Sequence, residues 1–328
     1  MKKIINDPNN VVAETLKGLE YANDKLVYVE ELEVIAKKEK SGNVGIVSGG
    51  GSGHEPAHAG YVGKGMLDAA VAGNVFSSPS PDRIIEGIRR ADSGKGVLLV
   101  IKNYSGDIMN FDLAKELAEF EDIDVESVVV RDDVAVEDST YTAGRRGIAG
   151  TIFVHKVAGA AALKGYSLQE VKRIAQKACD NIRTMGMSMS ACTIPANGKA
   201  NFELGENEIE IGMGIHGEPG VEKTNIKTSK EIAEVLLKHI FDDKDFSGKE
   251  VALLVNGLGA TPLMELYILN KDVREILETK NIKVYKNLVG NYMTALDMSG
   301  CSITLMELDD ELKEMIDEKC ETSALTIN

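Results

Sequence analysis

The sequence predicts an α/β protein with two α/β domains, whose mixed and largely parallel sheets are flanked by helices. Strand-like and helix-like stretches alternate along the whole chain, and 328 residues are enough for two such domains. The run at 96–101 (GVLLVI) is almost continuously apolar, which is typical of a strand covered on both faces of a parallel sheet.

The first half of the chain supplies most of this alternation. Apolar residues at helical spacing predict the helices, and short β-branched or apolar runs predict the strands. Ser167 and Glu170 have the spacing of a capping box at the start of one helix. The expected order is a helix at 11–21, a strand at 44–48, an apolar stretch at 68–72, a helix at 82–91, a strand at 96–101, a helix at 108–120, a strand at 125–130, and helices at 147–163 and 167–183.

The pattern changes near Met187, where short strands cluster up to Ile211. We therefore expect an N-terminal domain at 1–186 and a C-terminal domain at 187–328. The acidic stretch 309–311 predicts a solvated helix start, because negative charge is favourable at a helix N-terminus. The other expected elements are a helix at 229–241, a strand at 250–255, a helix at 262–278, and strands at 283–288 and 302–308.

Composition excludes several classes of function. The net charge of −15 disfavours binding to nucleic acid or to an anionic membrane surface. The sequence shows neither an apolar run of membrane-spanning length nor a signal-peptide pattern, so we expect a cytoplasmic protein. The four cysteines lack metal-site spacing, which favours reduced, mostly buried thiols and no metal site.

Ligands of open α/β sheets bind beyond the carboxyl ends of the strands, and this rule selects four loops, at 48–58, 102–107, around His216, and at 256–262. Two of them hold a histidine in a Gly/Glu/Pro setting, GGGSGHEP around His54 and GIHGEPG around His216. Glycines let a ligand approach the main chain closely, and proline fixes the exit from the turn. We expect both histidines to be displayed at strand ends, where they can take part in acid/base chemistry.

Each motif also has a purely structural interpretation. The structural interpretation of the glycines at 49–53 is a tight strand-to-helix turn, that of Asp107 is the N-cap of the next helix, and that of Lys102 is a snorkelling surface lysine. The remaining histidines favour packing, with His155 on an apolar helix and His239 on an amphipathic one. The string GMGIHG matches a nucleotide-binding pattern, but the Glu-Pro-Gly sequence after it opposes the helix that such a site needs. The sequence contains no P-loop motif. A serine nucleophile elbow is disfavoured, because His54 stands where that motif needs glycine.

Taken together, several long motifs resemble one known family, the substrate-binding (K) subunits of dihydroxyacetone kinase, in particular the bacterial type linked to the phosphotransferase system. The resemblance extends from Asn6 to about Leu308. The strings that carry it are SGGGSGHEP at 48–56, IKNYSGD at 101–107, MNF at 109–111, DDVAV at 132–136, YTAGRRG at 141–147, GIHGEPG at 214–220, LGATP at 258–262 and LDM at 296–298.

The resemblance implies a role for each candidate residue. His216 would add to the C2 carbonyl of dihydroxyacetone and form a covalent hemiaminal, which glycerol cannot form because it has no carbonyl. Asp107 would act as general base on the terminal hydroxyl as it attacks the phosphoryl group. His54 would hydrogen-bond the substrate and assist as acid/base, and Gly51 and Lys102 would contact its oxygens.

The resemblance also implies partners. This chain would carry no cofactor and no metal. A helical kinase subunit would hold ADP or ATP with Mg²⁺, and together the two would make dihydroxyacetone phosphate. The phosphoryl group would come indirectly from a phosphotransferase-system protein or from free ATP. A homodimer is expected. A non-catalytic, dihydroxyacetone-binding co-activator of a transcription regulator is the alternative, and a Schiff-base aldolase using Lys102 has little support.

Overall fold

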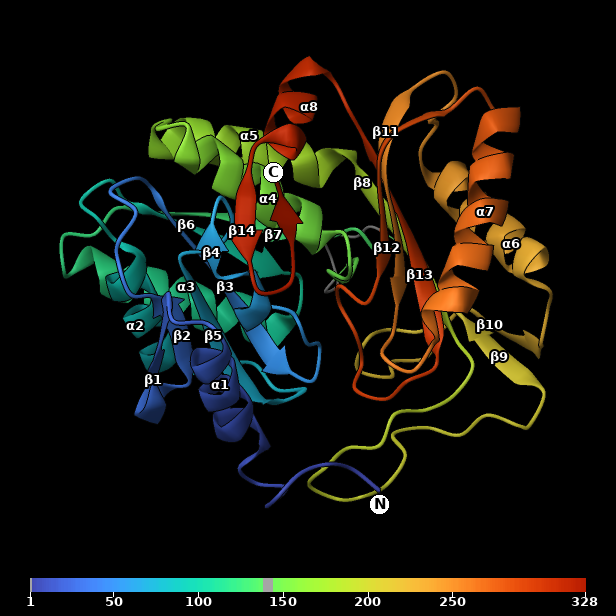
Figure 1. Ribbon diagram of the computed structural model, residues 1–328, viewed down its shortest axis with the longest axis horizontal. Coiled ribbons are helices and arrows are strands. Elements are labelled where there is room, and N and C mark those ends of the chain that lie inside the picture. The colour runs from blue at the N-terminus through green and yellow to red at the C-terminus, as the bar shows by residue number, and fades with distance from the viewer. Residues whose placement is uncertain (1, 138–143) are drawn as a thin grey trace. The chain divides into compact units, whose positions relative to one another are not determined.

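The computed structural model describes residues 2–137 and 144–328. The chain forms two compact units, each assembled from separate segments (Figure 1). The N-terminal unit comprises Lys2–Val130, Thr151–Asp180 and Leu312–Asn328, and the C-terminal unit comprises Arg131–Gly150 and Asn181–Glu311. The junction between 180 and 181 lies close to the boundary expected near residue 186. The units also exchange segments. Residues 131–150 belong to the C-terminal unit, and residues 312–328 belong to the N-terminal unit.

The N-terminal unit is built on a sheet with the strand order β1-β2-β5-β3-β6-β7. Strands β5, β3, β6 and β7 run parallel, and β1 and β2 add an antiparallel edge. A small second sheet joins β4 to the C-terminal β14 and β15. The strand bounds are β1 Leu26–Val29, β2 Val34–Lys37, β3 Gly45–Ser52, β4 Gly63–Lys64, β5 Ala69–Val75, β6 Val97–Lys102, β7 Val125–Val130, β14 Cys320–Thr322 and β15 Thr326–Ile327.

Successive side chains of the parallel strands point to opposite faces of the sheet, and this determines which helices each residue contacts. Val47 and Leu99 belong to the apolar core that also contains residues of α2 and α3, so their neighbours Ser48 and Val100 point to the opposite face. Helix α4 packs there against β3 and β6 and is apolar nearly all round, as expected for a helix buried on every side. The helices are α1 Val11–Ala22, α2 Pro81–Ala91, α3 Ser105–Glu119, α4 Thr151–Leu163, α5 Leu168–Asn181 and α8 Asp310–Asp317, with 3₁₀ turns at Glu30–Leu32 and Ala59–Tyr61.

The C-terminal unit has a sheet of order β10-β9-β8-β13-β11-β12, covered by α6 and α7 over a core of aliphatic side chains. Its pairs are antiparallel except for β11 with β12. Thr228 and Glu231 form a reciprocal capping box at the start of α6. The bounds are β8 Ile182–Ser188, β9 Glu208–Ile211, β10 Glu222–Asn225, α6 Ser229–Asp243, β11 Glu250–Gly257, α7 Leu263–Thr279, β12 Lys283–Gly290 and β13 Gly300–Glu307.

The predicted α/β class with mixed sheets flanked by helices is confirmed, with the parallel pairing concentrated in the N-terminal unit. One boundary changes the interpretation of the candidate site. The glycines expected to form a loop after Ser48 continue strand β3 as far as Ser52, because they stay in register with β5, with Gly49 opposite Val71. Pairing with a neighbouring strand overrides the low strand propensity of glycine. Two helices also begin elsewhere than expected, α3 earlier, at Ser105, and α4 later, at Thr151.

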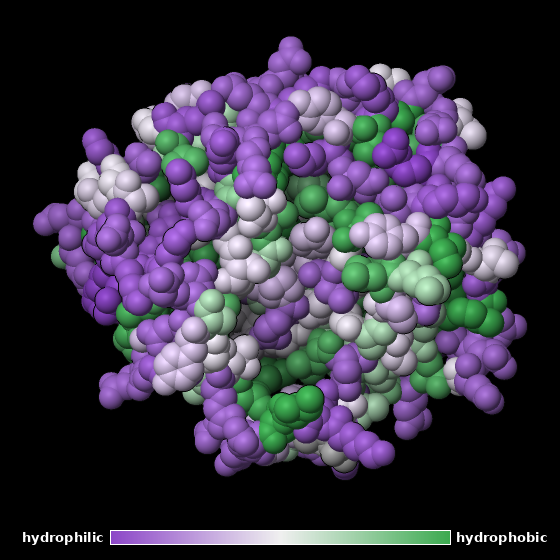
Figure 2. Space-filling view, in the orientation of Figure 1, coloured by the Kyte–Doolittle hydropathy of each residue, from purple (hydrophilic) through white to green (hydrophobic). Residues whose placement is uncertain are grey.

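Hydrophilic side chains dominate the face shown in Figure 2, in keeping with the high net charge. Helix α7 is an exception, because it exposes Leu263, Met264, Tyr267 and Ile268 beside the edge strand β12. No helix within the described residues is both long and apolar enough to cross a membrane. The four cysteines are buried free thiols, as predicted.

Candidate active site

Strands β3 and β6 bring the first two candidate segments together at the carboxyl edge of the N-terminal sheet. They are parallel neighbours with Ser48 opposite Val100, so Gly50 lies level with Lys102 on the face that α4 covers. Lys102 is fully buried, and its Nζ lies 5.4 Å from the centre of the Tyr104 ring. A snorkelling surface lysine is therefore ruled out for Lys102.

The backbone of Gly50 lies directly against the ends of the Lys102 and Asp107 side chains. A Cβ atom at Gly50 would lie 2.9 Å from Nζ of Lys102 and 3.4 Å from Oδ2 of Asp107, so the absence of a side chain makes room for both groups. Its φ of +153° is also a backbone conformation that other residues rarely adopt. The strand thus presents bare backbone to an ammonium group and a carboxylate.

Asp107 lies in the first turn of α3, three residues after the N-cap position, which Tyr104 occupies. The structural interpretation of Asp107 as only the N-cap is therefore wrong. Its side chain is buried, and Oδ1 has no hydrogen-bond partner among the described residues. A buried carboxylate oxygen with unused acceptor capacity is suited to receive a proton from a bound molecule.

His54 departs from the sequence prediction, because it is fully buried and not displayed. Its ring stacks on Phe76, with 5.3 Å between ring centroids and 22° between planes. Gly51 lies under the same segment, and a Cβ there would approach the backbone nitrogen of Ser77 to 2.6 Å. Packing of the 76–77 backbone against β3 therefore fixes the His54 ring and needs glycine at position 51.

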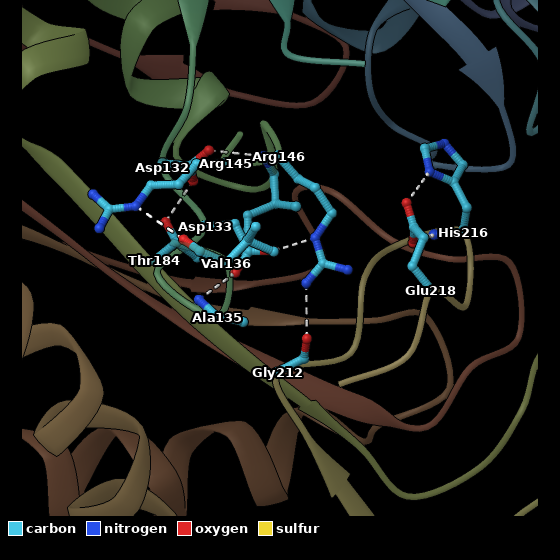
Figure 3. A network of polar contacts seen from close by, with 11 residues as sticks. Asp132, Asp133, Ala135, Val136, Arg145, Arg146, Thr184, Gly212, His216 and Glu218 are labelled. Carbon is cyan, nitrogen blue, oxygen red and sulfur yellow. Dashed lines mark hydrogen bonds and ion pairs between the residues drawn. The ribbon is translucent and has the colours of Figure 1, made fainter. Parts of the chain in front are cut away.

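His216 belongs to the C-terminal unit, in the hairpin loop that joins the antiparallel strands β9 and β10. Glu218 holds it twice, since Oε2 accepts from the His216 backbone N–H at 2.9 Å and Oε1 lies 3.0 Å from the ring Nδ1 (Figure 3). Asn201 donates to the His216 carbonyl at 3.1 Å. The side chain is 19% exposed, so this histidine is displayed as predicted.

Glu218 determines which tautomer the neutral His216 ring adopts. Burial alone would raise the pKa of Glu218, but the hydrogen bond and charge interaction with His216, together with the Arg146 charge, lower that pKa to about 2. An ionised carboxylate only accepts hydrogen bonds, so Nδ1 of His216 carries the proton and Nε2 carries the lone pair. Nε2 is therefore the nucleophilic or basic atom of this ring.

Arg146 connects the histidine loop to the rest of the C-terminal unit (Figure 3). It donates to Gly212 O at 2.8 Å, and its Nε pairs with Asp133 Oδ2 at 2.7 Å. Burial raises the pKa of Asp133 to about 6, although the Arg146 charge acts in the opposite direction. Asp132 accepts from the backbone N–H groups of Ile148 and Gly150 and from the Thr184 hydroxyl. Asp133 and Arg146 thus support the histidine loop, whereas Asp132 fixes the backbone at 148–150.

The sequence did not assign roles to several residues near the candidates. Glu218 lies in the motif that contains His216, so its position two residues after the histidine was an available signal. His58 and His155 face each other but are far apart in sequence, and nothing in the sequence pairs them. Asn256 lies at the end of strand β11, in the segment that the sequence selected as a loop, and its amide holds the backbone of Tyr292 and Met293. Residues 141–143 of the YTAGRRG motif lie outside the described residues.

The described residues contain no group of three or more His, Cys, Asp or Glu side chains arranged to hold a metal ion. Each unit carries its own set of hydrogen-bonding and acid/base groups, and each set is called a half-site below. The N-terminal half-site consists of Gly50, Gly51, His54, Lys102 and Asp107, and the C-terminal half-site consists of His216 and Glu218.

Comparison with known proteins identifies the family. The Dak1 domain model matches residues 17–324. The chain is 54% identical over 314 residues to the PTS-dependent dihydroxyacetone kinase 1, dihydroxyacetone-binding subunit DhaK, of Listeria innocua, covering 95% of each. It resembles the solved structure of the dihydroxyacetone kinase operon co-activator Dha-DhaQ with a TM-score of 0.90, 39% identity and coverage of 95% and 97%. It resembles the dihydroxyacetone kinase of C. freundii with a TM-score of 0.90 and 35% identity, covering 99% of this chain and 60% of that longer one.

These relatives confirm the resemblance that the sequence motifs indicated. The match runs through almost the whole chain and includes the strands and loops that carry both half-sites. The chain belongs to the Dak1 domain family.

Proposed function

We propose that this chain is the dihydroxyacetone-binding subunit of a dihydroxyacetone kinase of the phosphotransferase-linked type. The observation that carries the proposal is the His216–Glu218 pair, because it fixes a nucleophilic Nε2 on a partly exposed ring. The name and the high identity of the Listeria relative support the same substrate.

In the proposed binding step, Nε2 of His216 adds to the C2 carbonyl carbon of dihydroxyacetone. The N–C bond forms as the carbonyl π bond breaks, and the oxygen gains a proton. The oxygen takes its proton from water, and the ring releases its Nδ1 proton to water, so the protons balance and the resulting hemiaminal is neutral. The Glu218 carboxylate stabilises the positive charge that the ring carries during the addition, since it already accepts from Nδ1. Glycerol lacks the carbonyl and is therefore excluded by chemistry.

The N-terminal half-site supplies the proposed phosphoryl-transfer groups. We assign to Asp107 the role of general base, which takes the proton of the terminal hydroxyl through its unpartnered Oδ1. Lys102 and the backbone at Gly51 would contact substrate oxygens, and His54 would donate a hydrogen bond and assist as acid/base. The burial of His54, Lys102 and Asp107 supports these roles, because hydrogen bonds and charges act more strongly away from water.

The phosphoryl donor belongs to the proposed partner. We propose that a separate helical subunit holds ADP or ATP with Mg²⁺, and that a phosphotransferase-system protein supplies the phosphoryl group indirectly. The Listeria relative, which matches this chain over 95% of its length, is named as one subunit of a kinase, and this supports a partner that holds the nucleotide. Free ATP as the donor is the other possibility that the resemblance allows.

A second candidate function is a non-catalytic, dihydroxyacetone-binding co-activator. The structural similarity to the operon co-activator favours it specifically. Both functions need the His216 chemistry, so they differ in turnover and not in binding. The higher identity to the Listeria kinase subunit favours the kinase role.

Intact-mass spectrometry of the full chain incubated with dihydroxyacetone tests the proposal. We expect one added dihydroxyacetone per chain and no adduct with glycerol; an unmodified protein would contradict the covalent mechanism. Adding a helical nucleotide-binding subunit with its phosphoryl donor should then yield dihydroxyacetone phosphate, whereas this chain alone with ATP and Mg²⁺ should not. An adduct without turnover under those conditions would favour the co-activator.

We also propose a homodimer. The apolar side chains that α7 exposes beside the edge strand β12 support this face as the contact between two copies. Light scattering should give twice the mass of one chain, and Met264→Glu with Tyr267→Lys should give the monomer. A dimer that survives both substitutions would place the contact elsewhere.

A further inference from the structure

A buried group of polar side chains lies next to Lys102 on the face of the sheet that α4 covers. It contains Ser48 on β3, His58 in the following segment and His155 on α4. Both histidines are buried, and their rings meet edge to face with centroids 5.2 Å apart. Neither ring belongs to the proposed reaction, and buried polar groups normally have hydrogen-bond partners.

The position of this group connects it to the N-terminal half-site. Ser48 and Gly50 are two residues apart on β3, so they point to the same face, roughly 7 Å apart along the strand. Ser48 contacts His58, and the space above Gly50 contains Nζ of Lys102. The His58 ring and the Lys102 ammonium thus occupy successive positions on one face.

The hydroxyl of Ser48 fixes the tautomer of His58. Its single proton goes to the Val100 carbonyl at 2.7 Å, since a carbonyl can only accept. The same oxygen lies 3.3 Å from Nδ1 of His58, so Nδ1 must be the donor there. The lone pair of His58 is therefore on Nε2, which is buried and has no hydrogen-bond partner among the described residues.

His155 provides a second unused acceptor. Within the described chain, both of its ring nitrogens are buried without a partner. Burial, followed by the charge of Lys102, lowers the pKa of His155 to about 3 and holds that of His58 well below its usual range. Besides Lys102, the nearby titratable groups are His54, whose charge would also lower the pKa of His58, and Tyr61, whose ring lies 6.0 Å from that of His155. Both rings stay neutral at physiological pH, so each offers one lone pair.

We propose that His58 and His155 are positioning residues for Lys102, whose ammonium they hold against Gly50 through one buried water, which accepts from the ammonium and donates to their bare ring nitrogens. The proposal rests on the proposed function, in which Lys102 contacts the substrate. A metal between the rings has no support, because the described residues lack a third ligand of the right kind.

Nitrogen-15 NMR of the imidazole side chains tests the first step without any substrate. We expect His58 to be the neutral Nδ1–H tautomer and neither ring to titrate between pH 5.5 and 8. An Nε2–H tautomer of His58, or a ring that gains a proton near pH 6.5, would overturn the proposal. This measurement is independent of whether the chain binds dihydroxyacetone.

Calorimetric binding of dihydroxyacetone to the full chain tests the second step. His155→Leu should weaken binding about tenfold, and His155→Gln, which keeps an acceptor, should stay within about threefold of the wild type. The control is His239→Leu, a partly exposed histidine on α6 in the other unit, which should bind normally.

A double-mutant cycle distinguishes positioning from general structural damage. If His155 acts through Lys102, His155→Leu should have no further effect on binding in a Lys102→Met background. The same loss in both backgrounds would overturn the proposal, and so would equal losses in His155→Gln and His155→Leu. If the wild type binds no dihydroxyacetone while NMR gives the expected tautomer, then the proposed function fails and the tautomer assignment stands.

Discussion

The two half-sites hold their histidines by different physical means. His54 is buried and fixed by packing, with its ring on Phe76 and the 76–77 backbone against Gly51. His216 is partly exposed and is fixed by the hydrogen bonds that it donates to a carboxylate in its own loop. Histidines in nearly identical sequence settings thus have opposite environments.

This difference suggests a division of tasks. A partly exposed ring with a defined lone pair can meet and release a small ketone without opening a core. A buried carboxylate and ammonium instead provide a fixed electrostatic environment, which is what proton and phosphoryl transfer need. We therefore expect substitutions at His216 and Glu218 to change adduct formation, and substitutions around Gly50 to change turnover or folding.

The largest effect should come from removing the His216 ring. His216→Ala should abolish the dihydroxyacetone adduct, because it removes the Nε2 atom that forms the bond. Intact-mass spectrometry checks this, with unchanged circular dichroism as the control for folding. A persistent adduct in this variant would place the covalent bond on another residue.

Asp107→Ala should separate the half-sites most clearly. Turnover with the partner subunit should fall by roughly 10²–10⁴, the usual contribution of a general base, while the adduct on His216 is retained. Steady-state kinetics and intact mass measure the two quantities on one preparation. Loss of the adduct together with turnover would show that the half-sites do not divide the work as proposed.

The architecture was largely predictable from sequence, because hydrophobic periodicity reports burial directly. The apolar run of β6 illustrates this. Of the capping box predicted at Ser167 the structure shows one hydrogen bond, which Ser167 Oγ accepts from the Glu170 backbone N–H at 3.4 Å. The continuation of β3 through its glycines was not predictable, since glycine has low strand propensity and only pairing with β5 keeps it extended.

The candidate residues were predicted through the family motifs, but their environments were not. Burial of His54 depends on Phe76, which is a neighbour only through the parallel arrangement of β3 and β5. The His58–His155 pair likewise needs α4 to cross the sheet. Sequence spacing carries no information on such contacts, whereas the short Glu218–His216 contact lies within one turn of the chain.

Gly50→Ala should test whether bare backbone matters in the packed half-site. The new methyl group would lie 2.9 Å from Nζ of Lys102, in a strained backbone conformation. We therefore expect either a loss of about 1–3 kcal/mol in folding free energy or a roughly ten- to hundredfold decrease in kcat/KM. Gly18→Ala is the matched control, because a Cβ there meets nothing within 4 Å. Denaturant unfolding and kinetics measure both. Equal behaviour of the two variants would contradict the role of Gly50.

Glu218→Gln should have the smallest effect, because it keeps the size and shape of the side chain, removes the charge and leaves one acceptor oxygen in place of the two that His216 uses. Adduct formation should weaken roughly tenfold, the order expected for losing one charged hydrogen bond. The pH dependence follows from the pKa of Glu218, which is about 2 in the folded chain and 4.5 when unperturbed. The folded state favours the ionised form, so this stabilisation is complete above pH 4.5 and is lost as the pH falls towards 2. The stability difference between wild type and Glu218→Gln in denaturant unfolding should therefore be larger at pH 6 than at pH 3, and a difference independent of pH would show that the carboxylate charge does not hold the His216 loop.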